Sequence, residues 1–405
     1  MKRLLVSTLC IFISSSPFPV RAYIYPSFTQ VPNAIAEISA SGRYLVGFEF
    51  ITTHEELAAE YERTNQLPDF TYRISLWENT EGNVEQISDV TLETPLLTDI
   101  VPIFGLAFSP DETAIAIRED EAIRILGVPS LETETTIPIP VGQSLLIQSV
   151  AWSADSRYLA FTDDSQALAV WDRQSNSVVH STAEVPFDGR ITSTSTGWII
   201  QFALFSPTDE PRLFQTCDLL LTECRVYSLN EHFVYTSVRV APDGQGVLVT
   251  AEDGALWWWQ HEQGNEYLIP TAPLIELEGV SSEYPPFFSP DGQYLAVPRI
   301  QPDGAPALDV YEVETGMVVA SNYPAVTAAF VPETNALVWW DYRENHLLAV
   351  CLGQTEGEQI SASAEETVIQ ARFQFAANGD YLLIENENVE SFFDLWFAFP
   401  KIDCE

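Results

Sequence analysis

The stretch "FFSPDGQYLAVP", Phe287–Pro298, decides the fold, because it places two apolar runs on either side of a turn within twelve residues. Pro290 presets φ at the first central position of a turn, and Asp291 tolerates the next position. Gly292 can take the positive φ that closes the turn. The residues Tyr294–Val297 then predict a short, mostly buried strand. This stretch alone predicts two strands joined by a tight turn.

The same pattern occurs at seven other places along the chain. The copies read "ISASGRYLVG" from Ile38, "FSPDETAIAI" from Phe108, "WSADSRYLAF" from Trp152, "STSTGWIIQF" from Ser193, "VAPDGQGVLV" from Val240, "FVPETNALVW" from Phe330 and "FAANGDYLLI" from Phe375. Successive turns are 70, 44, 41, 47, 48, 42 and 45 residues apart. A period of about 40 to 45 residues is typical of four-stranded units arranged radially, each too small to bury its own faces. The sequence therefore predicts an all-β fold, a single β-propeller of four-stranded blades.

The number of repeats predicts eight blades, with seven as the alternative because the copy at Ser193 is degenerate. A propeller with a free edge would expose a row of unpaired backbone groups, so the ring must be closed. The last turn, at Ala377, is followed by only two clear strands, "YLLIE" and "ESFFDLWFAF". We therefore expect the N-terminal segment "YIYPSF", Tyr23–Phe28, to pair with the C-terminal strands and close the ring.

A second landmark follows most turns, an apolar run around an aromatic residue. It reads "ISLWE", "LAVWD", "ALWWW", "LDVYE" and "FDLWF". The turn with its following "YLA", together with Trp171 and Asp172, resembles the repeats of WD40 and WD40-like (TolB-type) β-propellers, over nearly the whole chain after residue 30. The resemblance implies the propeller fold. No Gly-His dipeptide precedes any repeat, so it does not extend to the histidine-based hydrogen-bond network of strict WD40 blades.

The first 22 residues, "MKRLLVSTLCIFISSSPFPVRA", have the features of a secretory signal peptide. Lys2 and Arg3 precede an apolar stretch, and Ala22 is a small residue at a suitable cleavage position. An uncleaved membrane anchor is a weaker interpretation because serines and prolines interrupt the run before about 18 apolar residues. A lipoprotein site at Cys10 is weaker still, since Leu9 precedes it. We therefore expect a secreted or periplasmic protein whose propeller spans residues 23–405.

Four cysteines remain after this leader, and export makes disulfides the default interpretation. Cys217 and Cys224 flank "DLLLTE", which predicts a turn between adjacent strands, so a bridge between them is the first choice. Cys351 would then pair with Cys404 and hold the C-terminal segment. Four cysteines allow three pairings, which sequence cannot distinguish. A zinc site is the rival, disfavoured because there is no C-x-x-C spacing and no histidine close by in sequence.

Charge is strongly unbalanced, with 58 acidic against 18 basic residues and a net charge of −40. Such a surface repels phosphate backbones and anionic lipid, so we expect no nucleic-acid binding and no direct binding to anionic membranes. A cationic partner, such as a basic protein or Ca²⁺, is one interpretation of this charge. Adaptation to a saline or acidic exterior is the other, and the one we favour. No other cofactor is expected, and we expect a monomer.

Catalytic motifs are not found in the sequence. The two His-Glu pairs continue as "HEELA" and "HEQGN", so neither completes an H-E-x-x-H zinc helix. There is no G-x-S-x-G elbow, Walker loop or G-x-G-x-x-G. The acidic stretches "REDE" (118–121) and "DD" (163–164) lack EF-hand spacing, so we interpret them as solvated turn residues. We predict no catalytic residues and no metal ligands. The alternative is a metal- or carboxylate-dependent hydrolase or lyase acting at the central channel.

The 70-residue interval contains the most informative departure from the repeat, "ITTHEELAAEYERTNQLPDF". Thr53 followed by Glu56 forms a capping box, so we predict a short helix from about His54 to Asn65, ending before Pro68, within an insertion at about residues 52–70. Because the insertion falls between the second and third strands of its blade, it should lie on the rim where propellers usually dock partners. Its candidate binding residues are His54, Glu55, Glu56, Glu60, Tyr61 and Arg63. A plug that only covers a channel mouth or an edge is the equal alternative.

The three consecutive tryptophans Trp257–Trp259 are the other unusual local feature. Because alternate residues of a strand face opposite sides, Trp257 and Trp259 should share one face and Trp258 take the other. Packing between neighbouring blades accounts for all three, and a carbohydrate or peptide platform is the competing interpretation. Taken together, the sequence predicts a non-enzymatic exported propeller that binds a protein, peptide or glycan through one rim.

Overall fold

The computed structural model describes most of the chain after residue 28. The described residues are 29–32, 35–51, 63, 69–81, 83–95, 103–119, 122–139, 150–162, 167–184, 190–194, 197–201, 214–227, 235–242, 244, 246–251, 253–262, 266–268, 274–275, 285–302, 304–325, 327–332, 334, 336–341, 346–352, 358–359, 371–386, 393–398, 402 and 404. They form an almost entirely β structure, as predicted.

The strands assemble into eight four-stranded antiparallel sheets, which we number as blades in chain order. Blade 1 contains β2 (Ile35–Ile38), β3 (Tyr44–Phe50), β4 (Asp69–Thr80) and β5 (Asn83–Pro95); blade 2 contains β6 (Ile103–Phe108), β7 (Ala114–Glu119), β8 (Ala122–Gly127) and β9 (Thr133–Pro138). Blade 3 contains β10 (Val150–Trp152), β11 (Tyr158–Thr162), β12 (Ala167–Asp172) and β13 (Ser177–Glu184); blade 4 contains β14 (Arg190–Ser193), β15 (Gly197–Gln201), β16 (Phe214–Asp218) and β17 (Cys224–Tyr227). The degenerate copy at Ser193 thus belongs to a sheet of its own.

The remaining sheets follow the same order. Blade 5 contains β18 (Tyr235–Val240), β19 (Gly246–Ala251), β20 (Leu256–Glu262) and β21 (Glu266–Leu268); blade 6 contains β22 (Phe287–Phe288), β23 (Tyr294–Ile300), β24 (Pro306–Glu312) and β25 (Val318–Tyr323). Blade 7 contains β26 (Ala328–Phe330), β27 (Leu337–Asp341), β28 (His346–Val350) and β29 (Glu358–Gln359). Blade 8 contains β30 (Ala371–Phe375), β31 (Tyr381–Asn386), β32 (Phe393–Ala398) and the N-terminal strand β1 (Thr29–Pro32).

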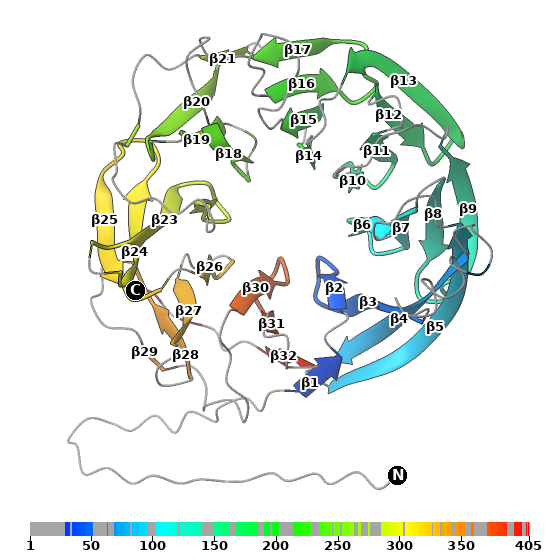
Figure 1. Cartoon of the computed structure of the whole chain (residues 1–405), viewed down its shortest axis with the longest axis horizontal. Helices are drawn as coiled ribbons and strands as arrows, with labels where there is room; N and C mark the ends of the chain where they lie inside the picture. Colours follow the sequence, from blue (N-terminus) through cyan, green and yellow to red (C-terminus); the bar gives the residue numbers. More distant parts are fainter. Residues whose placement is uncertain are drawn as a thin grey trace, which may run out of the picture.

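The blades stand in a ring, with the first strand of each blade nearest the central axis (Figure 1). Strand β1 pairs antiparallel with β32, with Thr29 opposite Trp396 and Pro32 opposite Phe393. A strand from near the N-terminus therefore completes the blade that contains the C-terminal strands. The pairing strand begins at Thr29, downstream of the predicted segment Tyr23–Phe28, which lies outside the described residues.

The hydrophobic core is divided among the junctions between neighbouring blades. Eight separate clusters of buried side chains occur, one at each junction around the ring, including the junction between blades 8 and 1. All six residues of β7 and all six of β19 are buried, because both faces of each sheet are covered by a neighbour. Each blade thus depends on the two beside it for its burial.

The three tryptophans of β20 illustrate this packing. Trp257 and Trp259 pack in the cluster shared with blade 4, whereas Trp258 packs in the cluster shared with blade 6. Phe214 of blade 4 lies edge-on to Trp259, with ring centroids 6.2 Å apart. The alternation predicted from the sequence is therefore confirmed, and the tryptophans serve the core.

The recurring tight turns join the first and second strands of the blades. Gly292 has φ +71°, as predicted for the residue that closes the turn. A serine opens four of the turns, Ser39, Ser109, Ser153 and Ser289, and its hydroxyl accepts a hydrogen bond from the backbone N–H five residues later at 2.9 to 3.0 Å. This side-chain bond fixes each turn at the start of the second strand.

Two turns carry a non-glycine residue at the position of positive φ, and both use its side chain to reach the preceding blade. Glu112 has φ +58° and accepts hydrogen bonds from the N–H and hydroxyl of Ser41 at 2.5 and 2.8 Å. Ser156 has φ +60°, and its hydroxyl accepts the N–H of Asp111 at 2.9 Å. The strained backbone at each turn is thus associated with a contact between blades.

In two blades, an arginine just before the second strand pairs with the acid that follows the tryptophan of the third strand. Arg157 donates to both carboxylate oxygens of Asp172 at 3.1 Å, and Arg43 donates twice to Glu78 at 2.8 and 2.9 Å. The hydrogen bond from Arg157 is the main cause that lowers the pKa of Asp172 to about 2. The acid after the strand tryptophan therefore anchors the arginine of the adjacent strand.

Replacing Ser156 tests the turn-to-turn contact. Ser156→Ala should lower the free energy of unfolding by about 1–2 kcal/mol, because the N–H of Asp111 loses its acceptor while the strained φ is retained. Ser156→Gly should cost less, because glycine adopts positive φ without strain. Urea denaturation of both variants measures the difference. Equal losses would show that the backbone at this turn is not strained.

Candidate functional site at the rim of blade 1

The insertion predicted to bind a partner lies mostly outside the described residues. His54, Glu55, Glu56, Glu60 and Tyr61 belong to that part of the chain. Arg63, the one residue of the predicted segment that the structure describes, lies in a helix and is exposed. The structure describes the strands at the base of the insertion, where the chain leaves β3 and returns to β4.

The hairpin formed by β4 and β5 is extended at this base. With 12 and 13 residues, β4 and β5 are the longest of the described strands. Strand β3 ends at Phe50, which pairs with Tyr72 of β4. Residues Asp69–Thr71 continue beyond that point and pair with Glu93–Pro95 of β5. The hairpin therefore extends past β3 at the end of the blade where the insertion is attached.

Next to this extension, described side chains on one face of blade 1 are exposed. Glu49 and Arg73, on neighbouring strands, form an ion pair at 3.2 Å, and their side chains are 62% and 43% exposed. Ile51, which is 38% exposed, extends the same edge and donates its N–H to the carbonyl of Thr71 at 3.0 Å. Exposed ion pairs of this kind contribute only about 0–1 kcal/mol to stability. These side chains are therefore accessible at the rim and add little to the core.

The opposite side of the hairpin carries a buried polar cluster between blades 1 and 2. The hydroxyl of Tyr72 donates to Glu119, and the guanidinium of Arg124 donates to both oxygens of the same carboxylate at 2.9 and 3.1 Å. Burial, and then the negative charge of Glu119, raise the pKa of the Tyr72 hydroxyl, so it stays protonated and acts as the donor. The cluster ties β4 of blade 1 to β7 and β8 of blade 2 at the base of the insertion.

The interpretation of "REDE" (118–121) as solvated turn residues is wrong for its first two members. Arg118 is 0% and Glu119 3% exposed, because β7 continues through Glu119 and both faces of the strand are covered. Asp120 and Glu121 lie outside the described residues. The signal that could have revealed the cluster is the opposite charge of Glu119 and Arg124 on either side of a short turn.

The buried acid at this rim, Glu119, is committed to contacts between the blades. The carboxylate of Glu119 is engaged by Tyr72 and Arg124, which suits it to holding blades together. Among the described residues, no three His, Cys, Asp or Glu side chains lie together in a way that could hold a metal ion.

No helix formed by the described residues is long and apolar enough to cross a membrane.

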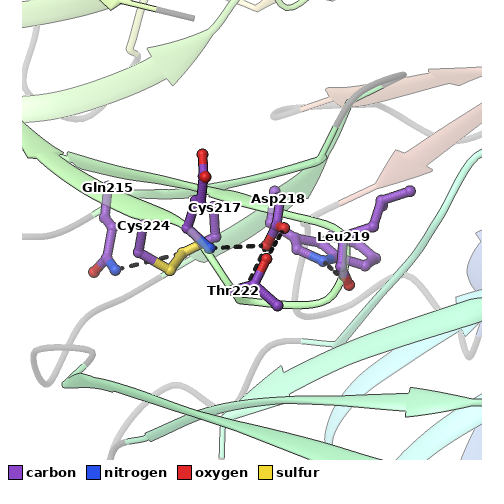
Figure 2. Close-up of a disulfide and its surroundings, with 8 residues drawn as sticks. Gln215, Cys217, Asp218, Leu219, Thr222 and Cys224 are labelled. Atoms are coloured by element: carbon purple, nitrogen blue, oxygen red, sulfur yellow. Dashed lines mark hydrogen bonds between the residues drawn. A yellow bond between two sulfur atoms is a disulfide. The ribbon is translucent and has the colours of Figure 1, made fainter.

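The structure joins Cys217 to Cys224 and Cys351 to Cys404, the two pairs favoured by the sequence. Cys217 and Cys224 lie directly opposite each other in β16 and β17. Figure 2 shows the bridge beside its turn, where Asp218 accepts the N–H of Thr222 at 2.6 Å. The second bridge spans 53 residues and attaches the C-terminal segment to blade 7, next to β28.

Solved structures with a similar arrangement of strands identify the fold. The C-terminal WD40 domain of Sif2 superimposes with a TM-score of 0.55, at 12% sequence identity over 93% of this chain and 99% of that domain. The chain has the WD40-like β-propeller fold. The β-propeller domain of Cps50 (Swd1) from Myceliophteria thermophila is a further neighbour, with a TM-score of 0.43 at 13% identity over 74% of this chain and 98% of that one. No protein-family profile and no curated protein sequence matches the chain.

Removing Arg124 tests the buried cluster of this WD40-like propeller. Arg124→Ala should lower the free energy of unfolding by about 3–5 kcal/mol, because it leaves the carboxylate of Glu119 buried without its ionic partner. The double variant Glu119→Gln/Arg124→Ala should recover much of that loss, since no unpaired charge remains. Guanidinium denaturation measures both. An equal loss in the single and double variants would mean that packing, and not charge, determines the effect.

The two disulfides should differ in their contribution to stability. Chain-entropy estimates give about 4 kcal/mol for the bridge that closes the longer loop, Cys351–Cys404, and about 2.5 kcal/mol for the shorter one, Cys217–Cys224. Replacing each pair with alanine and measuring denaturant midpoints checks this order. Identical unfolding of the parent protein with and without a reductant would contradict a stabilising role for either bridge.

Proposed function

We propose that this protein is an exported, non-enzymatic scaffold that binds a protein, peptide or glycan partner through the rim of blade 1. The binding surface comprises the insertion at about residues 52–70 and the exposed side chains at its base, Glu49, Ile51 and Arg73. Within the insertion, the residues assigned to partner contact are His54, Glu55, Glu56, Glu60, Tyr61 and Arg63.

The observation that carries this proposal is the asymmetry of blade 1. Its hairpin β4–β5 extends past β3 at the attachment point of a long insertion, and a buried cluster anchors the hairpin to blade 2. Binding residues concentrate on loops that a rigid scaffold positions. A fold of this kind supports many functions, so we infer the binding function from the local site and not from the fold alone.

Export is supported by the cysteines and by the first 22 residues. Two disulfides are typical of proteins that fold in an oxidising compartment. The leader predicted from Lys2, Arg3 and the following apolar stretch would deliver the chain to such a compartment. We therefore place the partner outside the cytoplasm, in the periplasm or the extracellular space.

Deleting Glu55–Pro68 tests the proposed surface. Because Ile51 is already hydrogen-bonded to Thr71, a short glycine linker should close the gap and leave the propeller folded. We expect the deletion variant to melt within a few degrees of the parent and to lose capture of its partner from an extracellular extract, read by quantitative mass spectrometry. Unchanged capture by the deletion variant would place the binding surface elsewhere.

A matched pair of charge variants separates contact from fold. Replacing Glu55, Glu56 and Glu60 with glutamine should weaken capture by roughly tenfold if these acids contact the partner. The control replaces three exposed acids on other blades, Glu132, Glu223 and Glu314, in the same way and should leave capture unchanged. Equal losses in both variants would indicate a general effect of net charge.

A further inference from the structure

The junction between blades 1 and 2 has a carboxyl group at its inner end, in a position where the other seven blades carry no acid. Glu37 lies on β2, the strand of blade 1 nearest the axis, opposite Val46 of β3, which in turn is opposite Leu76 of β4. Val46 and Leu76 are fully buried in the cluster shared with blade 2, which includes Phe108. Glu37 therefore extends an apolar row that faces blade 2.

The fold does not require an acid at this position. Glu37 stands two residues before the serine that opens its turn. The corresponding residues of blades 4, 5, 6 and 8 are Thr192, Arg239, Phe287 and Gln374, and those of blades 2, 3 and 7 are alanines: Ala107, Ala151 and Ala329. Each of these alanines packs at the hydrophobic junction with the next blade. An alanine would thus satisfy the packing, and the carboxyl group of Glu37 needs a separate explanation.

Glu37 makes a polar contact across the junction. Its Oε2 accepts the backbone N–H of Phe108 in β6 at 3.1 Å. Close to it in the chain, Ser41 of blade 1 donates to Glu112 of blade 2, so each blade extends one glutamate toward the other. Burial raises the pKa of Glu37 to about 8, and the bond from Phe108 opposes this only in part. At neutral pH the carboxyl group is therefore mostly protonated.

The charged groups nearby do not offset this burial. Strand β6 carries no titratable side chain, and β3 contributes only the hydroxyl of Tyr44 to the cluster facing blade 2. On the turn of blade 2, the carboxylate of Glu112 is bound by Ser41. At the far end of the junction, the carboxylate of Glu119 is paired with Arg124. None of these described groups supplies a cation to a Glu37 carboxylate.

We propose that Glu37 is a proton-operated latch for the junction between blades 1 and 2, closed while the carboxyl group is protonated and loosened when it ionises. Ionisation leaves a part-buried carboxylate beside Val46 and Phe108 with a single N–H donor. Local separation of β2 from β6 lets water solvate it fully. Because the Tyr72–Glu119 contact lies at the other end of the same junction, loosening also affects the rim of blade 1. The latch does not depend on the proposed function of that rim.

The direction of the pH effect follows from the pKa of Glu37 in the closed and in the opened junction. In the opened junction Glu37 is solvated and loses its proton above its usual pKa of 4.5, whereas in the closed junction it keeps the proton up to about pH 8. Between these values the opened state binds fewer protons, so each pH unit favours opening by about tenfold. Above pH 8 both states are ionised and the effect levels off.

Amide hydrogen exchange of the full-length mature protein tests the latch without any partner. Exchange rates are corrected for the intrinsic exchange of each amide, under conditions in which the junction recloses faster than the amide exchanges. The protection of the Phe108 amide should then fall by about tenfold per pH unit between pH 5 and pH 8. Glu37→Gln keeps an acceptor for Phe108 but cannot ionise, so its Phe108 protection should not vary with pH. The Asp111 amide, which is bound to Ser156 at the next junction, serves as the internal control.

Three results would overturn the proposal: constant Phe108 protection in the parent protein, the same pH slope in Glu37→Gln, or an equal slope at Asp111 and at amides of blades 4 to 7. The last would mean that Glu37 acts on global unfolding and not on one junction. If Glu37→Gln does not fold, the comparison of Phe108 with Asp111 in the parent protein still decides. Loss of partner capture in the deletion variant has no bearing on these measurements.

Discussion

Burial of both faces of every sheet between two neighbours is the constraint on which the structure depends. A four-stranded blade of this chain has apolar side chains on both sides, as the fully buried strands β7 and β19 show. One blade alone would leave both faces in water, and an open row of blades would leave two faces exposed at its ends. The eight hydrophobic clusters, one per junction, meet this constraint, and the pairing of β1 with β32 ties the last blade to the start of the chain.

Polar contacts set the registration of the blades, because apolar packing has little directionality. At the turns, the bonds from Ser41 to Glu112 and from Asp111 to Ser156 join successive blades. Glu112 and Ser156, which make these contacts, both have a positive φ. Inside two blades, an arginine held by the acid after a tryptophan links the second strand to the third. These bonds link blades and strands in a chain whose sequence lacks the histidine network of strict WD40 blades.

The sequence predicts the features that are set by local chemistry. The turn at Gly292, the alternation of Trp257–Trp259 and the pairing of Cys217 with Cys224 each depend on residues within one hairpin. The contacts that sequence reasoning missed join residues far apart in the chain, such as Tyr72 with Glu119, which are 47 residues apart. Nothing in "REDE" indicates that a distant tyrosine covers it. The closing strand β1 likewise pairs with residues more than 360 positions away, Thr29 with Trp396, and the predicted segment Tyr23–Phe28 lies outside the described residues.

The junction between blades 1 and 2 differs from the others in what lies at its ends. Its middle is an ordinary apolar cluster, but Glu37 lies at the inner end and the Tyr72–Glu119–Arg124 cluster at the rim. A part-buried acid with a raised pKa costs stability at neutral pH, since the unfolded chain ionises it freely. An alanine at the same position in other blades shows that this cost is avoidable. Glu37 therefore places a pH-dependent cost at the junction of the blade that carries the insertion, and the alanines at three other junctions carry no such cost.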